Sequence, residues 1–252
     1  MRRNNIDSNT SEDATTGIHK PNGLSGSRVL FEDNHLIIIS KLASEIVQGD
    51  KTGDSPLSET VKSYIKEKYN KPGRVFLGVV HRIDRPVSGA IIFARTSKAL
   101  TRMNEMLKNK TITKKYLAVV AVSPPASSGK LVHYLRKNEK QNKSYVVHES
   151  TRGAKRAELL YNVIAGSDRY FLLEVELLTG RHHQVRAQLA AIGSPIKGDL
   201  KYGYDRSNPG GSIHLHARSV SFTHPVRDET VHVVAPLPAG DPIWQLFETY
   251  LK

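Results

Sequence analysis

One carboxylate stands between two arginines in the segment GVVHRIDRPVSGA, residues 78–90. Asp84 has Arg82 two positions before it and Arg85 directly after it, ahead of a Pro-Val-Ser-Gly turn. An opposite charge within about 4–6 Å favours the ionised form of a carboxyl group. An ionised carboxylate is a poor general acid, but it can act as a nucleophile, stabilise a cation or form a structural ion pair. Two glycines, Gly78 and Gly89, bracket the loop between apolar runs, which favours a rigidly held functional group over an ion pair alone.

A second cationic segment, LLTGRHHQVRAQL, covers residues 177–189. It begins as an apolar strand and turns at a Thr-Gly pair. Arg181 is then expected at the start of a helix, and Arg186 inside that helix. His182 and Arg186 are four positions apart and are expected to share a helical face. An arginine fixed on a helix can bind a carboxylate or a phosphate through two parallel hydrogen bonds. Taken alone, such an arginine is more often part of a surface ion pair.

Three segments together resemble the RluA-type pseudouridine synthases, which isomerise uridine within an RNA chain. The segments are HRIDRPVSG at 81–89, KKYLAVV at 114–120, and LLTGRHHQVRAQLAAIGSPIKGDLKYG at 177–203. The likeness extends in order from about Val29 to the last strands. It implies an α+β fold in which helices flank a large, mostly antiparallel mixed β-sheet. The mixed order of the expected elements favours the same class independently.

The resemblance also implies roles for individual residues. Asp84 matches the essential aspartate, and Arg186 matches the basic residue that pairs with it. Tyr116 matches the tyrosine that packs against the uracil and is proposed to assist proton removal. Arg82 matches the arginine proposed to enter the helix stack that the target nucleotide has left. The expected substrate-binding side chains lie in the same two cationic segments: His81, Arg82, Arg85 and Arg181.

The chain departs from the family pattern at four positions. Ile83 and Val87 stand where Leu and Thr are usual, His182 fills a variable position, and Val185 replaces Ile. The missing Thr hydroxyl could remove one hydrogen bond within the loop, but it leaves the chemistry unchanged. The last motif of the resemblance is GDLKYG at 198–203. Its residues Asp199 and Tyr202 are expected to support the fold.

The implied reaction breaks the glycosidic bond, rotates the detached uracil and rejoins it through carbon 5. Asp84 could attack the anomeric carbon of the sugar or assist formation of an unsaturated sugar, and both routes remain open. Asp84 or Tyr116 is the candidate that removes the proton from carbon 5. The target uridine must leave its stack, which costs a few kcal/mol. The resemblance implies neither a metal nor an organic cofactor.

The charge balance predicts a polyanionic partner. Among 252 residues, 37 Lys and Arg outnumber 24 Asp and Glu, for a net charge of +13. RNA is the expected partner, either ribosomal or transfer RNA. The stretch 130–156 holds eight cations against two acids, with Tyr134 and Tyr145 among them. We read it as part of the RNA-facing surface, and the alternative is an exposed hairpin that is basic for solubility.

Cysteine is absent, which excludes disulfides, thiolate nucleophiles and cysteine-based zinc sites. His214 and His216 alternate on an expected strand, but no carboxylate joins them at a recognisable metal-ligand spacing. No apolar run approaches the roughly 20 residues that cross a bilayer. The expectations are therefore no metal, no membrane contact and a cytoplasmic location. The oligomeric state is not readable, and a monomer is the default.

The expected elements alternate irregularly between strand and helix. Residues 1–26 are expected to be a disordered or loosely ordered tail, and 27–252 one catalytic domain without a separate N-terminal RNA-binding domain. A hairpin is expected over 28–41. A helix is expected over 55–69, with Ser55 as its cap, Pro56 in its first turn, and Leu57, Val61, Tyr64 and Ile65 along one face. Further strands are expected at 89–95, 113–122, 129–137, 143–149, 154–166, 168–180, 212–225 and 230–236, and helices at 97–110, 182–193 and 241–251.

Two other functions are compatible with part of this pattern. An RNA-binding assembly factor could keep the fold without chemistry, although the intact set of Asp84, Tyr116 and Arg186 counts against it. A glycosidase-like hydrolase would need a second carboxylate facing Asp84 across the scissile bond. No comparable motif supplies one.

Overall fold

The computed structural model describes residues 24–49 and 53–251. Most of the tail expected over 1–26 lies outside these residues. Leu24, within the expected tail, is buried against the core, so the packed chain begins slightly earlier than expected.

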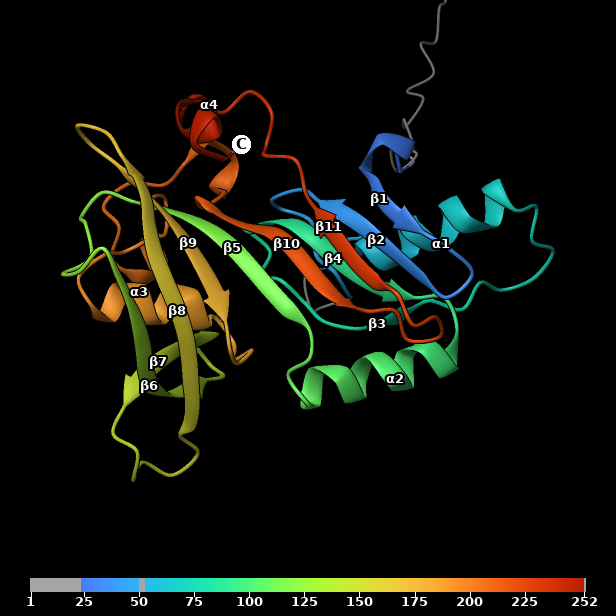
Figure 1. Ribbon diagram of the computed structural model, residues 1–252, viewed down its shortest axis with the longest axis horizontal. Helices are drawn as coiled ribbons and strands as arrows, with labels where there is room; N and C mark the ends of the chain where they lie inside the picture. The colour runs from blue at the N-terminus through green and yellow to red at the C-terminus, as the bar shows by residue number, and fades with distance from the viewer. Residues whose placement is uncertain (1–23, 50–52, 252) are drawn as a thin grey trace, which may run out of the picture.

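In the part of the chain that the structure describes, one mixed sheet of eleven strands forms the body of the molecule (Figure 1). Its main path runs β1-β2-β4-β10-β5-β9-β8-β6-β7, with β11 on β10 and β3 on β4. The strands β4 and β10 pair in parallel, and the other described pairs are antiparallel. The strands are β1 Val29–Glu32, β2 Leu36–Lys41, β3 Gly78–Val79, β4 Ser88–Ala94, β5 Thr113–Val120, β6 Ser128–Asn138, β7 Lys143–Val147, β8 Lys155–Gly166, β9 Phe171–Leu177, β10 Leu215–Thr223 and β11 Thr230–Val234.

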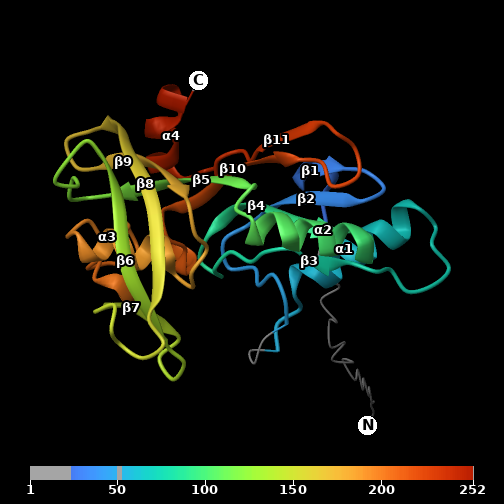
Figure 2. The same cartoon turned by 60° about the horizontal axis from the view of Figure 1, so that its bottom comes forward.

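Within residues 24–49 and 53–251, four α-helices flank the sheet, which confirms the expected α+β class. They are α1 Leu57–Lys68, α2 Ser97–Lys108, α3 Gln184–Ala191 and α4 Pro242–Glu248. The helix α3 packs against β6 and β7 in the curved part of the sheet, and α4 lies near the end of β5 (Figures 1 and 2). None of the described helices is long and apolar enough to cross a lipid bilayer.

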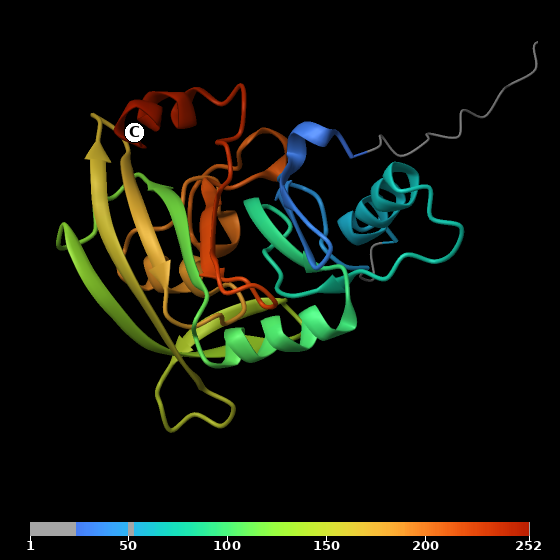
Figure 3. The same ribbon diagram turned by 45° about the vertical axis from the view of Figure 1, so that its right-hand side comes forward.

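The strands β2 and β4 are buried on both faces because helices cover each side (Figure 3). Successive side chains of a strand point to opposite faces. Ile37 and Ile39 of β2 accordingly pack in the cluster that includes α1, whereas Leu36 and Ile38 pack in the cluster that includes α2. Burial on both faces explains why these strands are continuous apolar runs.

The helix starts differ from one another in their capping. Pro56 is the N-cap of α1 and no side chain caps it, so the expected cap by Ser55 was wrong. The helix α2 begins after Thr96, whose hydroxyl oxygen accepts a hydrogen bond from the backbone N–H of Ala99 at 3.1 Å. The helix α3 ends as expected ahead of Gly193, which has a φ of 82°.

Gly89 sets the position of the loop that carries Asp84. It has a φ of 117° and lies opposite Ala217 in the parallel pairing of β4 with β10. A Cβ atom at this position would come within 2.3 Å of the carbonyl oxygen of Ala217. Only glycine fits such an approach, as the sequence predicted. The start of β4, and with it the loop 81–87, is thereby fixed against β10.

Candidate active site

A pocket of about 960 Å³ opens beside the loop 81–87 and contains all seven sequence-predicted site residues. Its walls are the loops before α1 and α3, parts of β5, and the turn between β6 and β7. Among the described residues that line it, Asp84 is the sole carboxylate. The lining cations are Arg82, Arg85, Lys108, Lys114, Lys137, Arg181, Arg186 and Lys201. The cationic lining therefore suits a polyanionic ligand, and Asp84 places one negative charge at the base of the pocket.

Arg186 joins two carboxylates at the base of the pocket. Its Nε and Nη2 donate to Asp199 at 2.7 and 2.8 Å, while its Nη1 donates to Asp84 Oδ2 at 3.1 Å. Arg186 and Asp199 are almost fully buried, whereas the Asp84 side chain keeps 26% of its surface exposed. Burial lowers the pKa of Arg186, but the hydrogen bonds and charge of Asp199 more than offset it, so the pKa lies above its ordinary value. The guanidinium is thus a permanent, fixed cation beside an accessible carboxylate.

The two arginines that flank Asp84 in the sequence do not form the expected clamp. Within the described residues, Asp84 pairs with Arg186 and with neither neighbour. Arg85 Nη2 instead lies 2.6 Å from Asp54 Oδ2 at the rim, and Arg82 is exposed on the pocket wall. Adjacent residues of an extended chain point in opposite directions, so Arg85 is poorly placed to pair with Asp84. Arg82, two positions before Asp84, is exposed.

His183 is a site residue that sequence reasoning missed. It stands just before α3 with a φ of 53°, and its Nε2 lies 3.6 Å from Asp84 Oδ2. Burial, and then the charge of Arg186, lower the pKa of His183 to about 2, so its ring is neutral. Nothing in the sequence pattern indicated a left-handed backbone at this position.

A hydrogen-bond chain determines which nitrogen of His183 carries the proton. The Tyr202 hydroxyl oxygen accepts from the backbone N–H of Ser144 at 2.9 Å and lies 2.9 Å from His183 Nδ1. An ionised Asp84 can only accept, which favours the proton on Nε2, and Nδ1 is then free to accept from the Tyr202 hydroxyl. This arrangement gives Asp84 a second polar neighbour.

Tyr116 and His81 enter the pocket as neutral side chains. Tyr116 lies in β5 and is 8% exposed, and burial followed by the negative charge of Asp84 raises its pKa well above the ordinary value. Its phenol is therefore protonated over the physiological range. His81 Nε2 accepts the backbone N–H of Ile92 at 3.2 Å, and burial with the charge of Lys114 lowers its pKa to about 3. Neither ring adds charge to the pocket.

Lys41 is a fully buried cation beneath the Asp84 loop. Its Nζ donates to the carbonyl oxygens of Asp84 at 3.3 Å, Arg85 at 3.1 Å and Val87 at 2.6 Å, and to that of Leu42 at 3.0 Å. Burial lowers the pKa of Lys41 to about 8, although the carboxylates of Glu45 and Asp84 oppose the shift. Lys41 thus fastens the loop to β2, and the sequence showed it only as the end of a strand.

Arg181 and His182 both precede α3, which begins at Gln184. The expected helical face shared by His182 and Arg186 was therefore wrong. Arg181 lines the pocket, and its Nε donates to the carbonyl oxygen of Arg156 at 2.9 Å. His182 turns instead towards the turn between β6 and β7.

His216 lies in β10 and His214 directly precedes this strand, and both side chains form hydrogen bonds within the protein. His214 Nε2 lies 3.1 Å from an Asp241 carboxylate oxygen, and its Nδ1 lies 2.8 Å from the side chain of Asn208. His216 Nδ1 lies 2.9 Å from the Ser88 hydroxyl. These contacts tie the start of α4 and the start of β4 to the sheet.

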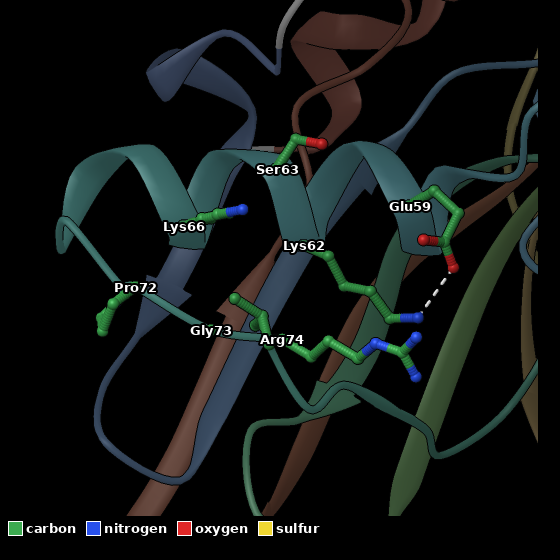
Figure 4. Close-up of a pocket in the computed structure, with 8 residues that line it drawn as sticks. Glu59, Lys62, Ser63, Lys66, Pro72, Gly73 and Arg74 are labelled. Carbon is green, nitrogen blue, oxygen red and sulfur yellow. Dashed lines mark hydrogen bonds and ion pairs between the residues drawn. The ribbon is translucent and has the colours of Figure 1, made fainter.

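A second pocket, of about 630 Å³, lies between α1 and the segment 72–75 (Figure 4). Lys62, Lys66 and Arg74 give it a positive lining, and its one acid, Glu59, forms a 2.7 Å ion pair with Lys62. Both side chains of that pair are well exposed, at 34% for Lys62 and 54% for Glu59, whereas the Arg186 side chain that pairs with Asp84 is 5% exposed. The chemistry is therefore expected in the larger pocket.

Known proteins resemble this chain over most of its described length. The family model described as RNA pseudouridylate synthase matches residues 35–191. The ribosomal large subunit pseudouridine synthase C of Yersinia pestis is 32% identical over 215 residues, which cover 83% of this chain and 65% of that protein. An uncharacterized RNA pseudouridine synthase of Bacillus subtilis is 32% identical over 223 residues, or 84% of this chain and 68% of that protein. The chain thus spans about two thirds of the length of these relatives.

A solved structure shows the same fold. The human RNA pseudouridylate synthase domain containing 4 superposes with a TM-score of 0.70 at 22% identity. The match covers 89% of this chain and 92% of that one. At this identity the likeness concerns the fold.

Proposed function

This chain belongs to the RNA pseudouridylate synthase family, and from that membership we propose that it isomerises uridine to pseudouridine within RNA. The observation that carries the proposal is the 3.1 Å contact between Arg186 Nη1 and Asp84 Oδ2 at the base of a cationic pocket. The names of the relatives favour ribosomal RNA as the substrate, with transfer RNA as the alternative. The catalytic unit would be residues 27–252, acting in the cytoplasm where its RNA substrate is found.

Asp84 is the group we assign to the sugar. As the bond between the anomeric carbon and N1 breaks, its electron pair leaves with the uracil. The Asp84 carboxylate either bonds to the anomeric carbon or takes a proton from the neighbouring sugar carbon to leave an unsaturated sugar. Arg186 would keep the carboxylate ionised and aimed at the sugar, because the buried pair with Asp199 holds its guanidinium still.

The uracil then turns and bonds to the sugar through carbon 5, which must lose its proton. In the covalent route the new bond at the anomeric carbon displaces the Asp84 carboxylate, and in the other route the unsaturated sugar takes back its proton from Asp84 as the new bond forms. Asp84 is then a free carboxylate in both routes and can accept the carbon-5 proton. The neutral phenol of Tyr116 could relay it, taking the proton on its oxygen while giving its own to Asp84. Tyr116 and Asp84 line the same pocket, which supports this relay. Nitrogen 1 of the uracil takes a proton from water, and the protonated Asp84 gives its proton to the hydroxide that remains, which restores the carboxylate.

The cations around the rim would hold the RNA while the target uridine is out of its stack. Flipping a nucleotide costs a few kcal/mol, and phosphate contacts with stacking on Tyr116 would offset that cost. Arg82 is exposed on the pocket wall, as expected of a side chain that fills the vacated stack. His81, Arg85 and Arg181 complete the proposed substrate-binding group.

The proposal is tested by incubating the protein with unmodified transcripts of ribosomal and transfer RNA and mapping pseudouridine by chemical probing. New pseudouridine at defined positions in one RNA class is the expected result. RNA binding without pseudouridine in either class would favour an assembly factor, and release of free uracil would favour a hydrolase. Either of these outcomes would overturn the proposal.

A further inference from the structure

The turn between β6 and β7, residues 138–143 and here called the hairpin turn, is attached to the segment that precedes α3. His182 makes the attachment: its Nδ1 lies 2.9 Å from the Ser144 hydroxyl, and its Nε2 lies 3.1 Å from Asn142 Oδ1. The amide oxygen of Asn142 can only accept, so Nε2 carries the proton and Nδ1 accepts from Ser144. Burial lowers the pKa of His182, which is consistent with this neutral ring. Both ring nitrogens of His182 therefore form hydrogen bonds with the β6–β7 hairpin.

The same ring packs on the site itself. His182 is stacked on His183 with 3.8 Å between ring centroids and 19° between planes. His183 in turn faces Asp84. The hairpin turn is thus joined to the catalytic carboxylate through two stacked rings.

Two residues that follow α3, Lys201 and Tyr202, also contact the hairpin. Lys201 Nζ donates to the carbonyl oxygens of Gln141 at 3.4 Å and Asn142 at 3.2 Å. The Tyr202 hydroxyl accepts the backbone N–H of Ser144. Figures 1 and 2 show β6 and β7 beside α3 at this end of the molecule. These contacts hold the hairpin turn in one position, and binding to a fixed turn loses less conformational entropy than binding to a mobile one.

Positive charge lies on the hairpin turn and on the end of β6 that leads into it, and one of these cations, Lys137, lines the pocket. Lys137, just before it, and Asn142 line the pocket with Asp84. Arg136, Lys137 and Lys140 are exposed, and Lys137 forms a 2.6 Å ion pair with Glu139. Three exposed cations against one acid at the edge of a pocket match a phosphate backbone.

We propose that the hairpin turn binds the RNA strand beside the target uridine, and that His182 is the positioning residue that fixes it over the pocket. The proposal rests on the proposed function for the identity of the polyanion. Because His182 contacts the hairpin and not the reacting atoms, it acts on RNA binding and leaves the chemical step unchanged. A loss of such uniform binding raises KM without changing kcat.

The test compares three variants with the wild type. His182→Phe keeps a ring against His183 but removes both hydrogen bonds to the hairpin. Asn142→Gly removes the acceptor while allowing the left-handed φ of 45° at this position. His232→Ala, an exposed residue of β11 outside both pockets, is the matched control.

His182→Phe and Asn142→Gly are each expected to raise the Kd for labelled RNA and the KM about tenfold, or about 1.4 kcal/mol. We expect kcat to stay within about twofold, since the chemistry is unchanged. The double variant should be little worse than either single one, because both remove the same contact. Hydrogen exchange should quicken at the amides of residues 141–145 in both variants. His232→Ala should match the wild type throughout.

An unchanged Kd together with faster exchange would show that the hairpin turn is held by His182 but does not touch RNA, and would overturn the proposal. A fall in kcat at constant KM would place His182 in the chemistry and overturn it as well. A wild type that binds RNA without making pseudouridine would contradict the proposed function alone, because the His182 effect on Kd could still be measured. Tighter binding of an acidic protein than of RNA would identify a different partner.

Discussion

Arg186 reaches Asp84 across 102 positions of the sequence, with Nη1 3.1 Å from Oδ2. The orientation of this contact is fixed because Arg186 Nε and Nη2 both donate to the buried carboxylate of Asp199. Rotation of the guanidinium towards Asp84 would break the pair with Asp199. The separation of Asp84 from its cation is therefore set by a buried ion pair, and solvent has little influence on it.

Asp84→Asn is expected to lower kcat at least about 10³-fold, since the amide is neither a nucleophile nor a base of useful strength. RNA binding should remain within about threefold of the wild type, because the rim cations are untouched. Single-turnover formation of pseudouridine measures the loss of catalysis, and fluorescence anisotropy measures RNA binding.

Asp228→Asn, in the exposed turn between β10 and β11, is the matched control and should leave both quantities unchanged. Loss of RNA binding in a folded Asp84→Asn protein would instead make Asp84 a structural residue.

Arg186→Lys tests the directional contact, because an ammonium cannot pair with Asp199 through two parallel bonds and reach Asp84 as well. We expect kcat to fall about 10²-fold, as expected for a small misplacement of a catalytic group. The free energy of unfolding should fall by about 3 kcal/mol, since Asp199 is left poorly paired in the interior. Urea unfolding and steady-state kinetics on the same preparation measure both effects, and a variant with normal kcat would remove Arg186 from the site.

Most of the fold was predictable because apolar residues repeat with the period of the element that they form. The runs at 36–39 and 90–93 predicted strands, and the stripe of Leu57, Val61 and Ile65 predicted α1. The pairing partners were not predictable, since a strand pattern does not say which strand lies beside it. The two-residue β3 was missed because it is too short to show a period.

The candidate site was predictable only in part. The motifs predicted Asp84, Tyr116 and Arg186, which the structure brings together in one pocket. The local sequence also suggested that Arg82 and Arg85 flank the Asp84 carboxylate, but within the described residues neither pairs with it. Lys41 was missed because its carbonyl acceptors come from a loop 43 or more positions away. His183 was missed because its contact with Asp84 depends on a left-handed backbone, which a sequence of L-residues rarely signals.

Tyr116→Phe is expected to lower kcat about 10²-fold and to leave the Kd for RNA within about twofold. The phenyl ring keeps the stacking surface, while the hydroxyl that could relay a proton is lost. Because the pKa of Tyr116 is raised, the residue stays protonated from pH 6 to 9, and the pH profile of kcat should have the same shape in both proteins. Wild-type turnover by the variant would remove the proposed relay.

The pH dependence of kcat should report on Lys41. Its pKa of about 8 lies below the ordinary value for lysine, so the buried group loses its charge as the pH rises through about 8. The neutral amine has two donors instead of three for the carbonyl oxygens of the Asp84 loop. We therefore expect full kcat below about pH 7 and a decline through pH 8.

Lys41→Met separates this effect from other titrations. The variant should fold, show kcat lowered about 10–100-fold at pH 7, and lack the decline near pH 8, because the titrating group is gone. Circular dichroism verifies the fold at each pH. A decline near pH 8 that persists in Lys41→Met would assign it to another group.

RNA binding is expected to weaken steeply with salt, because the cations of the pocket release counterions from the phosphates. The logarithm of the binding constant should fall linearly with the logarithm of the salt concentration, with a slope of about −0.7 to −0.9 for each phosphate contacted. Lys108→Ala and Lys137→Ala each remove one pocket cation, and each should reduce the magnitude of the slope by about 0.7 to 0.9, the contribution of one phosphate contact. Lys98→Ala, on α2 and outside both pockets, should leave it unchanged. Titrations of labelled RNA at 50 to 400 mM salt measure the slopes, and equal slopes in all four proteins would show that the phosphates bind elsewhere.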